Sequence, residues 1–295
     1  FFFNINQTEP ISKLPEKNSL NVNFKKSINN IKFVWFGHSS ILVSINDKIV
    51  LIDPVFSESA SPVDWLVPRY QPPALNLNQL PKIDFILISH DHYDHLDMET
   101  IKYFKEKNVS FLVPLGVSSH LKKWGVKGKN IFELDWWEEI QINNLKFICT
   151  PAQHYSGRMG FFKSQKSLWA SWIVESENKN FYYSGDSGYD THYKEIGKRY
   201  GPFDLVFMDS GQYNKRWKAV HNFPEEAVDA FQDLKGEYLL PVGWGMFTMA
   251  MHNWYDPPEQ VFKFAKKKNI KLLTPILGQL VDLQNIPPNN QWWKN

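Results

Sequence analysis

The chain has 295 residues, of which 33 are lysine or arginine and 31 are aspartate or glutamate. This length allows one large domain or two small ones, and the near-neutral charge argues against a nucleic-acid partner, because such proteins normally carry a clear basic excess. No apolar run reaches membrane-spanning length. The one cysteine, Cys149, cannot form an internal disulfide, so the sequence leaves the compartment undetermined.

Residues 1–30 are polar and rich in asparagine and lysine, which predicts an N-terminal extension lying over the surface. The chain begins with three phenylalanines and no methionine. Two interpretations stay open for them: the remainder of a removed leader or anchor, or a plug that docks on the fold. We expect residues 31–295 to form a single domain, because no internal repeat or low-complexity linker divides them.

The domain begins with β-rich runs at residues 32–36, 40–45 and 48–52, and Asn46-Asp47 predicts a hairpin turn. Residues 54–81 hold six prolines and little periodicity, which predicts a long loop of the kind that is often functional. Further strands are predicted over 83–89, 110–114, 131–134, 139–142, 145–150, 169–175, 180–184, 205–208, 238–242, 272–275 and 279–283. Helices are predicted over 98–107, 118–124, 224–234 and 257–268.

Strands come first in runs and then alternate with helices, and this happens twice along the chain. The pattern predicts an α/β (α+β) fold in which two sheets pack face to face with helices outside, a four-layer αββα sandwich.

Three histidines and two aspartates lie within seven residues, Ser89–His95, directly after the apolar run 83–88. A core strand has no use for so many titratable groups, because burying unpaired charge is costly. Imidazole nitrogen and carboxylate oxygen are ligands that zinc prefers, so the cluster predicts metal chemistry. Two more candidates follow later strands: His154 after 145–150, and Asp186 after 180–184 within Ser184-Gly185-Asp186-Ser187-Gly188.

The segment His90-Asp91-His92-Tyr93-Asp94-His95 resembles the HxHxDH signature of the metallo-β-lactamase fold. Four further stretches resemble the branch that contains N-acylphosphatidylethanolamine-hydrolysing phospholipase D and its bacterial relatives: residues 35–40, 51–54, 151–154 and 195–204. The similarity covers roughly residues 31–285 and implies an αββα sandwich with metals at the sheet edge. For a bacterial relative, both cytoplasm and cell envelope stay open.

The resemblance implies two metal sites. One metal would lie on His90, His92 and His154, a second on Asp94 and His95, and Asp186 would bridge them. Asp53 would orient a ligand, as metal-bound histidines usually require. Zinc is the expected metal, with manganese or iron as alternatives.

One position departs from the family pattern. The family supplies a last histidine to the second metal in a His-Trp-Gly motif, and here Gly243 stands in its place, before Trp244 and Gly245. The second site would then keep only Asp94, His95 and Asp186. The first metal is expected, whereas the affinity of the second site should fall, and that site would be either empty or completed by water or by a substitute such as His252.

The resemblance implies a hydrolase in which a metal-activated hydroxide attacks phosphorus or a carbonyl carbon, with Asp186 and Asp94 in catalytic positions. A phosphodiester, such as a phospholipid, is the expected substrate. Two alternatives stay open: a lactone or other ester hydrolase on the same fold, and a catalytically impaired metal-binding protein, which Gly243 favours.

Substrate contacts are expected from Arg158, His221 and His252, and each of these residues could equally have a purely structural role. His38 is expected to be a hydrogen-bonded structural histidine near the site. The 54–81 loop carries Trp65, Leu66, Val67 and Tyr70, which would either pack ordinarily or form an apolar groove for peripheral membrane contact. The sequence leaves the oligomeric state open.

Overall fold

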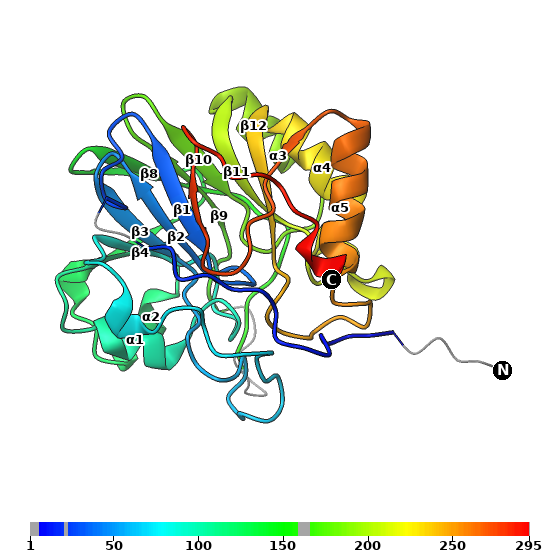
Figure 1. Ribbon diagram of the computed structural model, residues 1–295. Coiled ribbons are helices and arrows are strands. Elements are labelled where there is room, and N and C mark those ends of the chain that lie inside the picture. The colour runs from blue at the N-terminus through cyan, green and yellow to red at the C-terminus, as the bar shows by residue number, and fades with distance from the viewer. Residues whose placement is uncertain (1–5, 21–22, 159–165, 295) are drawn as a thin grey trace.

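The computed structural model describes residues 6–20, 23–158 and 166–294, and contains two seven-stranded sheets that lie face to face (Figure 1). The three N-terminal phenylalanines lie outside the described residues. No described helix is both long enough and apolar enough to cross a membrane.

The first sheet has the strand order β14-β1-β2-β3-β4-β5-β6. Strands β1, β2 and β3 form the predicted antiparallel meander, and β4, β5 and β6 continue in parallel. The bounds are β1 Ile31–Trp35, β2 Ile41–Ile45, β3 Lys48–Ile52, β4 Phe85–Leu87, β5 Ser110–Pro114, β6 Ile131–Leu134 and β14 Leu280–Asp282.

The second sheet repeats this arrangement with the order β13-β12-β11-β10-β9-β8-β7. Strands β7 to β10 are antiparallel neighbours, and β10 to β13 are parallel. The bounds are β7 Glu139–Ile142, β8 Leu145–Thr150, β9 Ser171–Glu175, β10 Asn180–Tyr183, β11 Phe203–Asp209, β12 Gly236–Val242 and β13 Lys271–Leu272.

The main core lies between the two sheets. Successive side chains of a strand point to opposite faces, so Phe33 and Trp35 enter this core while Val34 points to the outer face. Two helices, α1 (Met98–Phe104) and α2 (Ser118–Lys123), cover the outer face of the first sheet.

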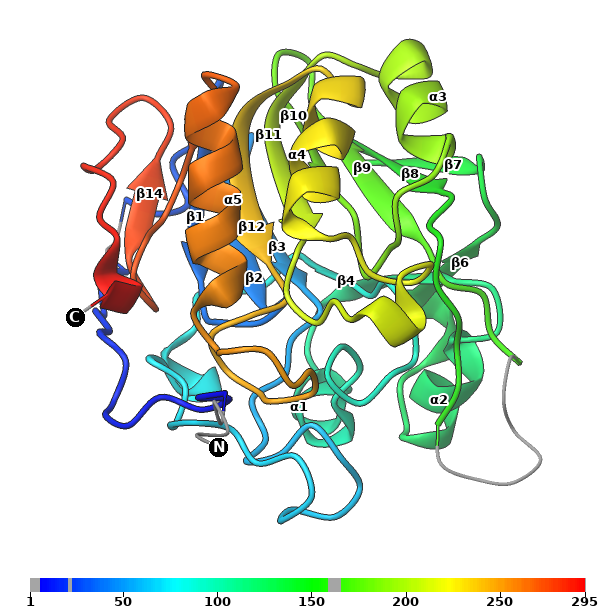
Figure 2. The ribbon, with the colours of Figure 1, turned by 90° about the vertical axis from the view of Figure 1, so that its right-hand side faces the viewer.

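The outer face of the second sheet is covered by α3 (His192–Arg199), α4 (Pro224–Asp233) and α5 (Asp256–Lys267), which lie in front of it in Figure 2. The predicted four-layer αββα sandwich is therefore confirmed.

Helix α3 was not predicted, although His192, Tyr193, Ile196 and Gly197 are buried on one face with the spacing of an amphipathic helix. The predicted strand 272–275 is wrong beyond Leu272, because β13 ends there, before Pro275. The 54–81 region is largely irregular, as expected, with one short 3-10 turn at Leu77–Gln79. The described part of the N-terminal extension packs on the domain, with Leu14 buried in the main core.

The segments that carry the candidate site residues all lie at the same edge of the sandwich, where they follow or end strands. Strands β3 and β4 are parallel, and β8 runs in the direction of β10, β11 and β12. Their carboxyl ends therefore meet, as at the ligand-binding edge of other parallel sheets. The segments that follow them, or end them, carry Asp53, His90–His95, His154, Asp186, Asp209 and Gly243.

Candidate metal centre

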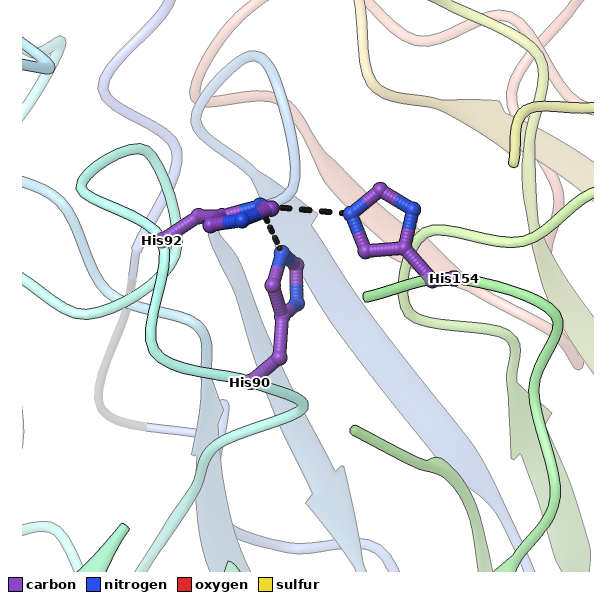
Figure 3. A group of neighbouring side chains, drawn as sticks. All are labelled: His90, His92 and His154. Atoms are coloured by element: carbon purple, nitrogen blue, oxygen red, sulfur yellow. Dashed lines mark hydrogen bonds between the residues drawn. The ribbon is translucent and has the colours of Figure 1, made fainter. Parts of the chain in front are cut away.

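The first donor group consists of three imidazoles whose nitrogens converge on one point (Figure 3). His92 Nδ1 lies 2.9 Å from His90 Nε2 and 3.2 Å from His154 Nε2. In a tetrahedral zinc site with metal–ligand distances of about 2.0–2.1 Å, neighbouring donors lie about 3.3 Å apart. The three histidines therefore have the spacing of a metal-binding tripod.

The second donor group lies beside the first and combines carboxylates with imidazoles. His95 Nε2 lies 3.3 Å from Asp94 Oδ2 and 3.1 Å from Asp186 Oδ1. The other Asp186 oxygen, Oδ2, lies 3.9 Å from His154 Nε2 of the first group. Asp186 thus turns one oxygen toward each group, which is the arrangement of a bridging ligand.

Hydrogen bonds on the far side of the rings fix how the imidazoles face the site. His95 Nδ1 lies 2.6 Å from Asp53 Oδ2 and donates to it, and His154 Nδ1 donates to the Val220 carbonyl at 2.9 Å. Each bond leaves the Nε2 lone pair directed into the site, as metal ligation requires.

The residues present fit a metal ion. His95 Nε2 is buried without a hydrogen-bond partner while it faces two carboxylates, an arrangement that a bound cation would satisfy. Burial and the neighbouring imidazoles lower the pKa of His90 well below its usual value, and burial lowers the pKa of His154 to about 3. Burial alone would raise the pKa of Asp94, but the adjacent His95 and His38 hold it well below its usual value. Burial disfavours the charged His95 ring, but Asp186 and Asp94 hold the pKa of His95 well above its usual value, so His95 would release a proton on binding a metal. Neutral imidazoles and ionised carboxylates are the forms that bind zinc, manganese or iron.

His221 lies at the same site, and the buried carboxylate of Asp209 fixes its orientation through a hydrogen bond. Its Nδ1 donates to Asp209 Oδ2 at 2.9 Å, and its Nε2 lies 3.9 Å from Asp186 Oδ2. Burial disfavours the charged ring, but Asp209 and Asp186 raise the pKa of His221 to about 9. The imidazole expected to contact substrate therefore faces the donors.

Gly243 is constrained by its surroundings as well as lacking a ligand atom. Its φ is +85°, a conformation that side chains rarely adopt, and a Cβ there would lie 2.9 Å from Asp209 Oδ1. The Gly211 backbone also passes so close that a Cβ on Gly211 would overlap the Gly243 carbonyl. A histidine at position 243 would need Asp209 to move.

His252 does not replace the missing histidine. Its Nε2 lies 2.8 Å from the Gly211 carbonyl and its Nδ1 lies 2.9 Å from the Asn253 carbonyl, while the ring stacks on Tyr213. Both ring nitrogens are therefore occupied by backbone carbonyls, and neither joins a donor group among the described residues.

Arg158 holds the histidine loop in shape. Its Nη1 donates to the carbonyls of Asp91 at 2.9 Å and Leu96 at 2.7 Å, and its guanidinium lies 3.8 Å from the centre of the Tyr93 ring. It also lines a cavity of about 680 Å³ beside the loop, together with Asp91, Tyr93 and Trp124. None of the converging metal donors lines this cavity.

The site opens toward solvent beside His92, which is half-buried, and Tyr155, whose surface is 46% exposed. The Tyr155 ring packs against the rings of His92 and His154, at 4.7 Å from each. Sequence reasoning missed Tyr155 and Asp209. Asp209 carried a usable signal, because it ends a buried apolar strand as Asp186 follows one.

The chain is similar to several known proteins. The family model described as a beta-lactamase superfamily domain matches residues 48–244. An uncharacterized protein of Mycobacterium tuberculosis is 42% identical over 265 residues, which cover 88% of this chain and 71% of the relative. The N-acyl-phosphatidylethanolamine-hydrolyzing phospholipase D 1 of Caenorhabditis elegans is 37% identical over 242 residues, covering 78% of this chain and 68% of that protein.

Among solved structures, Igni18, a metallo hydrolase from the archaeon Ignicoccus hospitalis, superposes with a TM-score of 0.66. It is 21% identical, and the match covers 86% of this chain and 98% of that one, so it supports the fold. The donor geometry, the family match and these relatives lead to one conclusion: the chain belongs to the metallo-β-lactamase superfamily of metal-dependent hydrolases, among homologues of N-acyl-phosphatidylethanolamine-hydrolysing phospholipase D.

Proposed function

We propose that this protein is a two-metal phosphodiesterase, with zinc as the metal, that acts on a phospholipid in the manner of a phospholipase D. The observation that carries the proposal is the position of Asp186, whose two oxygens face the two adjacent donor groups. Paired metal sites of this kind serve many phosphoester hydrolases, in which bound metal ions lower the pKa of water and stabilise both the attacking and the leaving oxygen.

The residues around the donors support this chemistry. Asp209 orients His221, so that His221 Nε2 faces Asp186 and can carry a proton for the leaving oxygen. Asp94 is buried and engaged by His38 and His95, so it serves as a fixed carboxylate rather than as a mobile base.

A lipid substrate is favoured by the similarity to the Caenorhabditis elegans phospholipase and by the tip of the 54–81 loop. Trp65 is 78% exposed and Leu66 is 53% exposed, whereas Val67 and Tyr70 pack against the main core. We propose that Trp65 and Leu66 contact the lipid surface peripherally, because an aromatic ring with a polar edge suits the membrane interface.

The test is a substrate comparison on protein reconstituted with zinc, manganese or iron. We expect hydrolysis of bis(p-nitrophenyl) phosphate and of N-acylphosphatidylethanolamine in mixed micelles, and much slower hydrolysis of p-nitrophenyl phosphate and of lactones. A matched variant, Asp186→Asn, should lose this activity. Faster hydrolysis of lactones would refute the phosphodiester proposal in favour of an ester hydrolase, and no hydrolysis by a fully metal-loaded protein would favour an impaired metal-binding protein.

A further inference from the structure

We infer that His38 is a ligand of the second metal and takes the place of the histidine that Gly243 lacks. This inference rests on the proposed two-metal site. It concerns a residue from the opposite sheet, in the turn between β1 and β2, rather than from the segment after β12.

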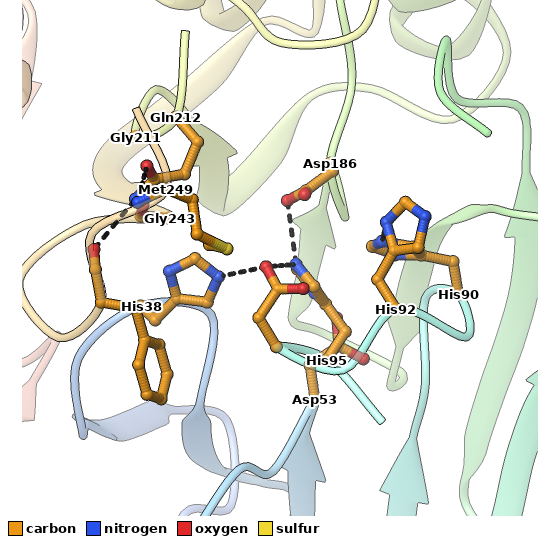
Figure 4. Close-up of polar contacts among 12 residues, drawn as sticks. His38, Asp53, His90, His92, His95, Asp186, Gly211, Gln212, Gly243 and Met249 are labelled. Atoms are coloured by element: carbon orange, nitrogen blue, oxygen red, sulfur yellow. Dashed lines mark hydrogen bonds and ion pairs between the residues drawn. The ribbon is translucent and has the colours of Figure 1, made fainter. Parts of the chain in front are cut away.

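The His38 imidazole already lies in the second donor group. Its Nε2 is 2.8 Å from Asp94 Oδ2, and the described donors include a group of His38, Asp94 and His95. Figure 4 shows His38 on the Gly243 side of the site, between Gly243 and His95. The side chain is buried, and its ring packs edge to face against His95 and Phe247, with centroids 5.3 Å and 5.5 Å away. Asp186 Oδ1 lies 3.1 Å from His95 Nε2 and could complete this group of three as a fourth donor, the number that a tetrahedral zinc site uses.

The backbone places His38 directly beside the position of the missing histidine. The His38 amide donates to the Trp244 carbonyl at 2.7 Å, and the Gly243 amide donates to the His38 carbonyl at 3.0 Å. The Trp35 indole donates to the same His38 carbonyl at 2.9 Å. His38 adopts a left-handed conformation with φ of 49°, which turns the chain at this point. The imidazole of His38 therefore enters the site from a backbone position that is hydrogen-bonded to Gly243 and Trp244.

The other described histidines near this edge fit the role less well. Both nitrogens of His252 face backbone carbonyls. His221 presents Nε2 to the Asp186 oxygen that faces the first group, and its ring packs against His154. A histidine introduced at 243 would collide with Asp209.

A hydrogen bond from His38 to Asp94 is the competing role, and two substitutions separate it from ligation. In His38→Gln the side-chain amide can still donate to Asp94 but is a weak zinc ligand, whereas His38→Ala removes both functions. His120→Gln is the matched control, because His120 also faces an aspartate, Asp91, at 3.3 Å without joining a donor group.

The measurement is zinc per chain by elemental analysis, with affinities from titration against a chromophoric chelator. We expect two zinc ions in the wild type and in His120→Gln. Both His38 variants should keep the first zinc and should bind the second zinc more than roughly 100-fold more weakly than the wild type. Losing only a hydrogen-bond partner of a metal ligand usually weakens binding by about 10–100-fold, so the larger loss indicates ligation. Near wild-type affinity in His38→Gln would overturn the inference, and so would a wild type that binds one zinc ion.

A second measurement needs no variant. In the cobalt-substituted wild type, proton NMR should show hyperfine-shifted ring N–H signals from five imidazoles, those of His38, His90, His92, His95 and His154. Four signals, with His38 absent, would overturn the inference. Two bound metals in an inactive wild type, with the second metal lost in both His38 variants, would refute the proposed substrate and would still support His38 as a ligand.

Discussion

The carboxylate of Asp209 lies directly against Gly243. A Cβ at position 243 would come within 2.9 Å of Asp209 Oδ1, so the two positions cannot both carry a side chain without a shift. The other oxygen, Oδ2, accepts from His221 and lies 3.2 Å from the Ser187 amide, which donates to it. The glycine that departs from the family pattern is therefore matched to a carboxylate that positions another imidazole of the site.

This relationship predicts that restoring the family histidine will not by itself restore a metal ligand. Gly243→His should destabilise the protein by about 2–5 kcal/mol, because it adds left-handed strain to a clash with Asp209. Gly243→Ala should cost roughly 1–3 kcal/mol through strain and the Cβ contact alone. Urea unfolding measures both. In the double variant with Asp209→Ala, the histidine should be better tolerated than additivity predicts, and additive costs would contradict the coupling.

Because the two carboxylate oxygens of Asp186 face different donor groups, replacing Asp186 should weaken metal binding at both groups. Asp186→Asn should weaken the binding of both metal ions, whereas Asp94→Asn should leave one tightly bound metal per chain, since Asp94 contacts only the second group. Elemental analysis after dialysis distinguishes the two results. Asp64→Asn, at an exposed position on the 54–81 loop, should keep the wild-type metal content. Equal metal loss in the Asp94 and Asp186 variants would argue against a bridging role.

The contacts of Arg158 predict a structural cost for its replacement. Arg158→Met removes a guanidinium that donates to two loop carbonyls, and each hydrogen bond to a charged group contributes roughly 1.5–3 kcal/mol. We expect a loss of about 2–4 kcal/mol in the free energy of unfolding, together with weaker metal binding, since the loop carries four donors. Arg216→Met, at an exposed position, is the control. Unchanged stability with an increased KM would instead support a substrate contact.

His192 predicts a pH dependence that does not involve the metal donors. Burial lowers its pKa from 6.5 to about 4, with the ring packed on Tyr193 and 3.2 Å from the Ser187 hydroxyl. The pKa of His192 is lower in the folded state than in the unfolded state. The contribution of the neutral, buried ring to the free energy of unfolding is therefore fully present above pH 6.5 and is lost as the pH falls toward 4. At about 1.4 kcal/mol per pKa unit, the loss is at most about 3 kcal/mol.

The measurement compares unfolding of the wild type and His192→Gln in the metal-free protein from pH 7 to pH 4. The advantage of the wild type should shrink on acidification. A difference between the two proteins that stays constant across this range would contradict the assignment.

The fold was predictable because its signals are local. The strands of the first meander show themselves by β-rich runs broken by turn residues, and five ligand-type side chains stand within His90–His95. The lone His154 and Asp186 could be placed because each follows a strand, and strands that run in the same direction end at a common edge.

The remaining parts depend on packing between segments far apart in the chain. Arg158 binds main-chain carbonyls, which leave no trace in a sequence pattern, so the sequence could not distinguish this structural role from a substrate contact. The place of His38 beside Gly243 follows from the pairing of a turn in one sheet with a strand end in the other. Only the assembled sandwich brings these residues together.

Asp53 connects the site to the assembly of the whole molecule. This carboxylate follows β3 in the first sheet, orients His95, and accepts hydrogen bonds from the Ser89 amide and hydroxyl and from Tyr183 of β10 in the second sheet. The two sheets are thus joined, at the edge that carries the site, by the carboxylate that orients His95. Metal binding should consequently stabilise the packing of the two sheets against each other. The metal-bound protein should therefore unfold at a higher temperature or denaturant concentration than the metal-free protein.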